Sequence, residues 1–361
     1  MKLIQKNITA QLNYSFGCHY HLEDMVFFDI ETTGFSADIS SVYLIGCVYF
    51  QGNDWKLIQW FADDYISEAD MIQGFFQFLQ NFKLLIHYNG TGFDLPYLLK
   101  KCLQYQLNFD FSHIESLDLY KKLQPYKKYL PLSNLKLKTV ESLLNIPRKD
   151  CYDGGELIQL YSQYINGIFL KNPEIETHLH YLLLHNEEDI VNLLYLTEIL
   201  SYYDLINGKG TITSSTFDTQ RVTIQFNLSN PVPVPITIEK ESIILNANKQ
   251  NAVLTIPLYE GELKFFFDHY QDYFYLIKED IAVHKSVAIY VEKEYRTKAK
   301  ASNCYIKKTG LFAPQYGENL KPYLKKDYKD KVTYLEIDDD FFHNQENLKQ
   351  YTFNILQFLI K

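Results

Sequence analysis

The sequence has few cysteines and no long apolar run, and these two features argue against a disulfide-rich, secreted or membrane-spanning protein. Five of its 361 residues are cysteine, and no two of them lie within three positions of each other. This argues against a disulfide framework or a Cys-rich zinc site and fits a reducing cytoplasm. No run of eighteen apolar residues occurs, and residues 1–14 lack the apolar core of a secretory signal. We therefore expect a cytoplasmic protein that has no membrane partner.

Positive charge is also scarce overall, since the net charge is −9. That balance argues mildly against an ordinary nucleic-acid binder. The charge is uneven, however, because residues 293–331 hold 11 basic and 4 acidic residues, a net of +7. This stretch is either a solvated face or, beside an acidic catalytic domain, a contact for a phosphate polymer.

Hydrophobic residues make up 47 % of the chain, enough for two folded domains. Apolar runs at residues 25–30, 41–50 and 55–61 predict an antiparallel meander. Further strands are expected at residues 83–88 and 114–119. A helix should begin at Ser67, where Ser-Glu-Ala-Asp fits an N-cap, and further helices are predicted at residues 94–103, 132–144, 157–164 and 174–200. The prediction is an α/β domain at residues 20–203 with a mixed five-stranded sheet and flanking helices.

Residues 210–361 alternate apolar and polar positions and predict a β-rich accessory domain. One of its expected strands covers residues 286–291. Pro231, Pro233 and Pro235 indicate a loop or a sheet edge, because proline cannot donate to a central ladder. A helix is expected at residues 345–359.

Two acidic residues close the first predicted strand. Asp29 and Glu31 are two positions apart, so in a strand their side chains point to the same face. Adjacent carboxylates on a buried strand repel each other unless a cation neutralises them. Such hard oxygen ligands suit Mg²⁺ or Mn²⁺. The pair predicts a metal site, although an Asp-x-Glu pair by itself is more often structural.

Asp94 follows a predicted buried strand in the segment Asn89-x-x-x-Phe93-Asp94 and opens a helix. Its ordinary role would be that of an N-cap or first-turn acid. If its strand lies next to that of Asp29, Asp94 becomes a third metal carboxylate.

His185 and Asp189 are four residues apart in a predicted helix and therefore share one face. A histidine at this spacing can activate a water while the aspartate holds a metal. The alternative is a solvated polar patch, the role expected for Glu187 and Glu188.

Taken in order, these segments resemble the three exonuclease motifs of the DEDD superfamily, whose members are RNase H-like 3′–5′ exonucleases. The sequence Phe-Asp-Ile-Glu-Thr-Thr-Gly at residues 28–34 is similar to the first motif almost letter for letter. Residues 134–155 and 161–164 look like the YprB-like branch of predicted bacterial exonucleases. The resemblance covers roughly residues 20–200, and residues 201–361 resemble no family known to us.

The resemblance implies an RNase H-like fold and a two-metal hydrolysis of phosphodiesters, with two Mg²⁺ or Mn²⁺ ions per active site. One ion would be held by Asp29, Glu31 and Asp189, and the other chiefly by Asp29. Asp94 would act largely through water.

The resemblance also implies that His185 is the catalytic base, but the spacing departs from the family. Catalytic histidines there usually stand five residues before the last aspartate and catalytic tyrosines four, and His185 has the tyrosine spacing. Tyr181, one turn further back, is a second candidate for the base.

The expected substrate is a nucleic acid, most simply a single-stranded 3′ end, and the sequence leaves DNA and RNA equally open. Thr32, Thr33 and Asn89 are expected to receive the terminal nucleotide. Phe35 or Phe93 could stack on a base, although packing is the commoner role for Phe93. The second domain would orient the strand or bind a partner protein. The alternatives are a non-catalytic nucleic-acid-binding or scaffold protein and an endonuclease of the same fold.

Overall fold

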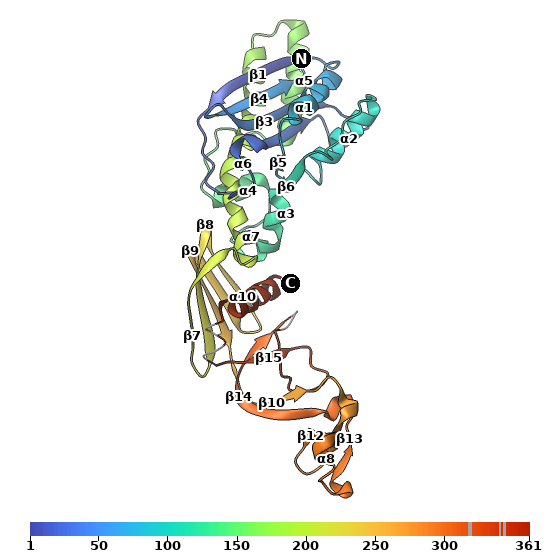
Figure 1. Ribbon diagram of the computed structural model, residues 1–361. Coiled ribbons are helices and arrows are strands. Elements are labelled where there is room, and N and C mark those ends of the chain that lie inside the picture. The colour runs from blue at the N-terminus through green and yellow to red at the C-terminus, as the bar shows by residue number, and fades with distance from the viewer. Residues whose placement is uncertain (317–319, 339–340, 342–343) are drawn as a thin grey trace. The chain divides into compact units, whose positions relative to one another are not determined.

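The structure, a computed structural model, describes residues 1–316, 320–338, 341 and 344–361. Two compact units divide the chain, Met1–Tyr203 and Asp204–Lys361 (Figure 1). Within the described residues, no helix combines the length and the apolar character needed to cross a membrane.

A six-stranded sheet in the order β1-β4-β3-β2-β5-β6 forms the centre of the first unit. The strands are β1 (Lys2–Ile8), β2 (Met25–Thr32), β3 (Val42–Gln51), β4 (Asp54–Phe61), β5 (Leu84–His87) and β6 (Glu115–Asp118). The first four pair antiparallel, whereas β5 runs parallel to β2, and β6 parallel to β5. The mixed sheet is as predicted, but the number of strands was wrong. The edge strand β1 escaped prediction because none of its side chains is buried and its apolar signal is weak.

Helices accompany this sheet on both faces. They are α1 (Glu68–Leu79), α2 (Asp94–Gln104), α3 (Leu119–Leu123), α4 (Leu137–Leu143), α5 (Gly154–Leu170), α6 (Ile175–Leu196) and α7 (Leu200–Ile206). Phe28 of β2 stacks on Phe75 of α1, with ring centroids 5.5 Å apart. The next residue, Asp29, contacts Asn186 of α6. Because successive strand residues face opposite sides, the sheet lies between α1 and α6.

Two local predictions for these helices were wrong. Residues 132–136 are not helical, because the Asn134 side chain accepts a hydrogen bond from the Lys136 N–H and forms a turn before α4 begins. Ser67 precedes α1 but does not cap it, since its hydroxyl donates to Asp64 and its backbone is already helical.

The second unit is β-rich, as predicted. Its strands are β7 (Gly210–Phe217), β8 (Arg221–Lys240), β9 (Ile243–Pro257), β10 (Tyr259–Phe266), β11 (Tyr273–Leu276), β12 (Ile281–His284), β13 (Arg296–Lys298), β14 (Tyr305–Gln315) and β15 (Thr333–Glu336). They form three sheets of three strands, β7-β8-β9, β10-β14-β15 and β12-β11-β13. The described helices are α8 (Lys285–Ala288) and α10 (Gln345–Ile360), and the second matches the expected C-terminal helix.

One prediction for the second unit needs correction, and another is confirmed. Residues 286–291 do not form a strand, because the His284 side chain accepts a hydrogen bond from the Ser286 N–H and caps α8. Of the two predicted positions for Pro231, Pro233 and Pro235, a loop or a sheet edge, the edge is confirmed, because all three lie in β8. The pairing of β7 with β8 stops at Leu228, so this part of β8 has only β9 beside it and tolerates the missing N–H groups.

Candidate active site

The four predicted carboxylates converge at the carboxyl end of β2. Asp29 and Glu31 stand on one face of this strand, and Asp189 reaches them from α6. Asp94, the first residue of α2, accepts a hydrogen bond from the main-chain N–H of Ile30. Its carboxylate therefore meets β2 between the two strand acids. The structure thus brings together residues that are up to 160 positions apart in the chain.

Burial and mutual repulsion raise the pKa values of three of these carboxyls. The pKa values of Asp29 and Glu31 lie well above the ordinary range, first because of desolvation and then because of the neighbouring acids. Desolvation also raises the pKa of Asp94 to about 7, although the hydrogen bonds that its carboxylate accepts from backbone N–H groups lower that pKa. Anionic oxygens held together in this way form a strong site for a cation.

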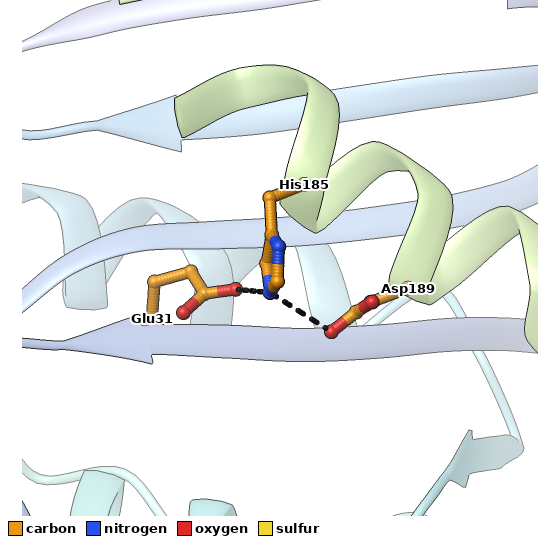
Figure 2. Close-up of side chains that lie close together, drawn as sticks. All are labelled: Glu31, His185 and Asp189. Atoms are coloured by element: carbon orange, nitrogen blue, oxygen red, sulfur yellow. Dashed lines mark ion pairs between the residues drawn. The ribbon is translucent and has the colours of Figure 1, made fainter. Parts of the chain in front are cut away.

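His185 extends from α6 into this cluster, between Glu31 and Asp189 (Figure 2). Its Nε2 lies 3.6 Å from Glu31 Oε1 and 3.5 Å from Asp189 Oδ2. One ligand atom from each of these three residues lies within 4.8 Å of the other two, a spacing that suits a shared ion. Tyr181, the other candidate for the base, instead packs against Tyr152, with ring centroids 5.2 Å apart.

Asp150, which the sequence did not single out, holds the other nitrogen of His185. Its Oδ2 lies 2.7 Å from His185 Nδ1, and the carboxylate is buried. A carboxylate in this position fixes the tautomer of the imidazole, so that Nε2 is the free acceptor that faces the cluster. Asp150 stands in the loop before α5, and only the fold brings it to α6, so no local motif could have identified it.

Arg148 is a second residue that the sequence did not reveal. Its guanidinium pairs with Asp189 at 2.5 Å, with Glu141 at 3.0 Å and with Asp150 at 3.2 Å. Although burial alone would lower the pKa of Arg148, the attraction of Asp189 and Glu141 raises it above its ordinary value. A permanent cation therefore holds Oδ1 of Asp189, while Oδ2 faces His185.

Glu188 anchors the loop that carries these two residues. Its carboxylate accepts hydrogen bonds from the N–H groups of Lys149 and Asp150, at 2.8 to 3.1 Å. The interpretation of Glu188 as a solvated surface acid was therefore wrong. Glu187 does lie at the surface, where it pairs with Lys6.

A glycine allows α6 to approach the sheet closely enough to place its acids. Gly46 of β3 pairs with Asp29 on one side and with Gln59 on the other. Above it lies the buried side chain of Asn186, which accepts from Gln59 Nε2 at 2.9 Å and donates to Asp29 Oδ2 at 3.3 Å. A Cβ on Gly46 would lie 2.0 Å from Asn186 Oδ1 and 2.2 Å from Ile190 Cδ1.

Gly46→Ala should therefore destabilise the first unit, because the added methyl group forces Asn186 or the whole helix away from Asp29. Overpacking of this kind costs about 1–3 kcal/mol. For a unit of this size that lowers the melting temperature by roughly 2–4 °C per kcal/mol. Gly154→Ala is the control, since nothing lies within 4 Å of a Cβ there. Equal melting temperatures for the two variants, measured by circular dichroism, would show that the close approach is unimportant.

A groove of about 460 Å³ opens beside Asp29 and Asp189. Its walls include Tyr88 and Asn89 from the loop after β5, Tyr120 from α3 and Lys136 from the segment before α4. Asn89 is thus the one predicted substrate residue that lines it. The Tyr88 and Tyr120 rings meet edge to face at 5.7 Å, and Lys136 is exposed. Aromatic rings and a free lysine beside the acids suit a nucleotide.

The other predicted substrate residues lie outside this groove. The Thr33 N–H donates to Ser41 O at 2.8 Å, and its hydroxyl accepts from the Ser41 N–H, so both stabilise the loop after β2. The Thr32 hydroxyl donates to Gly34 O. Phe35 is 95 % exposed and touches the edge of Phe93, at 6.3 Å between centroids. The two rings form an aromatic pair outside the groove, and their role in binding stays a prediction.

Asp118 and His87 hold the loop that carries Asn89 in place through hydrogen bonds to its backbone. Asp118 accepts hydrogen bonds from the N–H groups of Asn89 and Thr91 and also caps α3. His87 is buried, with Nε2 next to the Ser116 hydroxyl and Nδ1 accepting from the Gly90 N–H. Burial lowers its pKa to about 4, so it is neutral at physiological pH and acts as a core histidine.

Comparisons with known proteins support this description of the first unit. Residues 26–201 match the model of the RNase_H superfamily, and together with the mixed sheet this establishes an RNase H-like fold. No curated protein matches the chain.

Solved structures with some similarity include three nucleic-acid enzymes. The family B DNA polymerase of the hyperthermophilic archaeon Pyrobaculum calidifontis is 12 % identical, with a TM-score of 0.40 over 71 % of this chain and 35 % of the polymerase. Exonuclease I of Methylocaldum szegediense is 11 % identical, with a TM-score of 0.30 over 55 % of this chain and 53 % of that enzyme. The metal-free exonuclease I complex with single-stranded DNA from E. coli is 10 % identical, with a TM-score of 0.27 over 93 % and 70 %. This chain thus spans about a third of the polymerase and about half of the Methylocaldum enzyme.

Proposed function

We propose that this protein is a nuclease that requires Mg²⁺ or Mn²⁺ and removes nucleotides from the 3′ end of DNA or RNA. The observation that carries the proposal is the convergence of four carboxylates with a His185–Asp150 pair at the end of β2, on an RNase H-like fold. The 3′–5′ polarity rests on the resemblance of the three motifs to those of DEDD exonucleases.

The donor set fits hard divalent cations. Carboxylate oxygens are the preferred ligands of Mg²⁺ and Mn²⁺. The raised pKa values of Asp29, Glu31 and Asp94 mark burial, and then repulsion, of negative charge that a cation would offset. In this proposal Asp29, Glu31 and Asp189 hold one ion, and Asp29 is the main ligand of a second. Bound ions would polarise the phosphodiester and stabilise the charge that develops on its oxygens.

The chain's own residues supply the remaining functions. The attacking water forms a bond to phosphorus and passes its proton to His185 Nε2. The bond from phosphorus to the 3′ oxygen breaks, that oxygen takes a proton from solvent, and a nucleoside 5′-monophosphate is released. Asp150 holds the imidazole in the accepting tautomer and stabilises its charged form. Arg148 keeps Asp189 in place. Tyr88, Tyr120 and Lys136 border the groove in which the terminal nucleotide is proposed to lie.

The direct test uses single-stranded DNA and RNA labelled at the 5′ end, incubated with Mn²⁺ or with EDTA. A metal-dependent ladder that shortens one nucleotide at a time from the 3′ end is the expected result. Internal fragments without a ladder would instead assign an endonuclease. Tight binding without cleavage under any metal would assign a non-catalytic nucleic-acid-binding protein.

The charge of Asp94 should make the metal-free protein less stable as the pH rises. Its pKa is about 7 in the fold, far above its unfolded value. The group therefore contributes fully to stability below about pH 4 and loses that contribution as the pH rises through 7. Asp94→Asn, which cannot ionise, should become more stable than the wild type by on the order of 2–4 kcal/mol at pH 8 in EDTA.

Thermal melts of the wild type and Asp94→Asn between pH 5 and 8 measure this effect as a difference, which removes the contribution of groups that Asp94 does not influence. Asp110→Asn is the matched control, because Asp110 is exposed and its hydrogen bonds from Ser112 lower its pKa. A stability difference for Asp94→Asn that stays constant over this range would contradict the raised pKa.

A further inference from the structure

A hollow lined with aromatic rings lies in the second unit, in a part of the chain for which no function is predicted by family resemblance. It measures about 430 Å³ and lies between the end of β10, the turn before β11 and the segment before β15. The side chains that matter are Phe266, Phe267, Tyr270, Tyr323, Lys325 and Tyr328.

Ring contacts hold the aromatic side chains in place, but two of the rings remain accessible to solvent. Phe266 meets Tyr328 edge to face at 5.4 Å and also contacts Tyr305 at 5.3 Å. Nevertheless Tyr328 is 42 % exposed and Tyr270 is 36 % exposed. Large aromatic side chains that are fixed at the rim of a hollow, rather than packed into a core, are typical of sites that receive another ring.

Lys325 gives the hollow a fixed positive charge. Its main chain exchanges two hydrogen bonds of 2.9 Å with Lys264 of β10, which anchors the residue beside Phe266. Its Nζ lies 3.4 Å from Tyr328 O, and it forms an ion pair with none of the acids that the structure describes. The ammonium group is therefore available to an anion.

The surrounding sequence is the most basic part of the chain. Residues 293–331, which include Tyr323, Lys325 and Tyr328, carry a net charge of +7 in a protein of net charge −9. One acid, Asp268, stands at the rim and is exposed. Because basic residues outnumber acidic ones in this stretch, an anionic polymer is favoured as the ligand over a cation.

We propose that this hollow binds a single strand of nucleic acid, with a base stacked against Tyr328 and a backbone phosphate paired with Lys325. Stacking on aromatic rings together with lysine contacts to phosphates is the chemistry by which proteins hold single strands without reading their sequence. The hollow would then be a binding site separate from the carboxylate centre of the first unit. The choice of ligand rests on the proposed nuclease function, but the site itself is independent of it.

The test is the affinity of the full-length protein for a fluorescein-labelled oligothymidylate dodecamer in EDTA, measured by fluorescence anisotropy. Tyr328→Ala should weaken binding about tenfold, the effect of losing one stacked base. Lys325→Gln should weaken it and reduce the dependence on salt by about one phosphate contact. Tyr290→Ala is the matched control, since Tyr290 is 86 % exposed in the same unit and does not line the hollow.

An abasic dodecamer of the same charge separates stacking from charge attraction. The wild type should bind it more weakly than the oligothymidylate, and Tyr328→Ala should bind both equally. A Tyr328→Ala variant that binds the dodecamer as tightly as Tyr290→Ala, or a wild type that does not distinguish the two oligonucleotides, would overturn the proposal.

Hydrolysis of bis(p-nitrophenyl) phosphate, which is too small to need a second site, reports on the carboxylate centre alone. Unchanged hydrolysis with weakened dodecamer binding in Tyr328→Ala supports the hollow as a separate site. The wild type could hydrolyse neither bis(p-nitrophenyl) phosphate nor nucleic acid and still bind the dodecamer through Tyr328. In that case the nuclease proposal fails, while the proposed binding site in the hollow is retained.

Discussion

Asp29→Asn is expected to abolish nuclease activity while leaving the fold intact. Asp29 is proposed as a ligand of both metal ions, so its loss should exceed the roughly 10–100-fold effect of changing a residue that only orients a ligand. The amide has the same shape as the carboxylate and can still accept the hydrogen bond from Asn186 Nδ2. Removing one charge from a group of repelling acids should leave the metal-free stability unchanged or raised.

Two measurements separate this outcome from simple unfolding. The first is the rate of degradation of end-labelled DNA in Mn²⁺, with Asp38→Asn as the control, because Asp38 is a surface acid paired with Lys100. The second is the shift of melting temperature on adding Mn²⁺. A wild type saturated at a hundred times its dissociation constant gains about 2.7 kcal/mol by linkage, and Asp29→Asn should lose most of this gain. Turnover like that of the wild type in purified Asp29→Asn would refute the assignment of the site.

The sequence predicted that the four carboxylates lie close together, because each of them sits in a regular strand or helix. The period of two in a β-strand places Asp29 and Glu31 on one face, and the period of 3.6 in a helix places His185 and Asp189 on another. These rules depend only on neighbours in the chain. The order of strands then brings Asp94 to the same end of the sheet.

The residues that the sequence missed depend on contacts between distant loops. Asp150 and Arg148 lie in an irregular segment whose path is fixed by hydrogen bonds to Glu188, and no periodicity describes such a segment. Gly46 carries no side chain, so nothing in the local pattern shows that Asn186 lies against it. In each case the signal is a distance between two elements, which one sequence does not contain.

In the second unit, too, the sequence pattern did not predict every local structure. The alternation of residues predicted its β-rich character, but at residues 286–291 the side chain of His284 caps a short helix instead. A single hydrogen bond to the Ser286 N–H decides between the two structures there. By contrast, the prolines of β8 did predict a sheet edge, since the pairing of β7 with β8 ends before them.

His185→Ala should reduce the rate about 10²–10⁴-fold and retain metal binding, if His185 is the base. The structure strengthens the reason for this expectation, since Asp150 at 2.7 Å from Nδ1 directs Nε2 toward the acids. The variant should also lose the part of the pH dependence that arises from proton transfer to His185. His180→Ala is the control, since His180 is exposed on the same helix.

Asp150→Asn tests the same pair from its other side. The amide cannot stabilise a charged imidazole and can hold the wrong tautomer, so the rate should fall by about 10²-fold or more with an altered pH profile. A merely structural role for Asp150, through its contacts with Arg148 and Lys138, would lower the melting temperature without changing the pH profile.

Two other roles for His185 give different results. If Nε2 is a metal ligand together with Glu31 and Asp189, His185→Ala should weaken Mn²⁺ binding in calorimetry at least as much as it lowers the rate. If the side chain only orients a water or the scissile phosphate at the tyrosine spacing, His185→Tyr should keep its activity. We expect His185→Tyr to lose most activity near neutral pH, since a phenol accepts a proton poorly there while imidazole accepts it well. An unchanged rate and pH profile in His185→Ala would exclude all three roles and leave proton transfer to solvent.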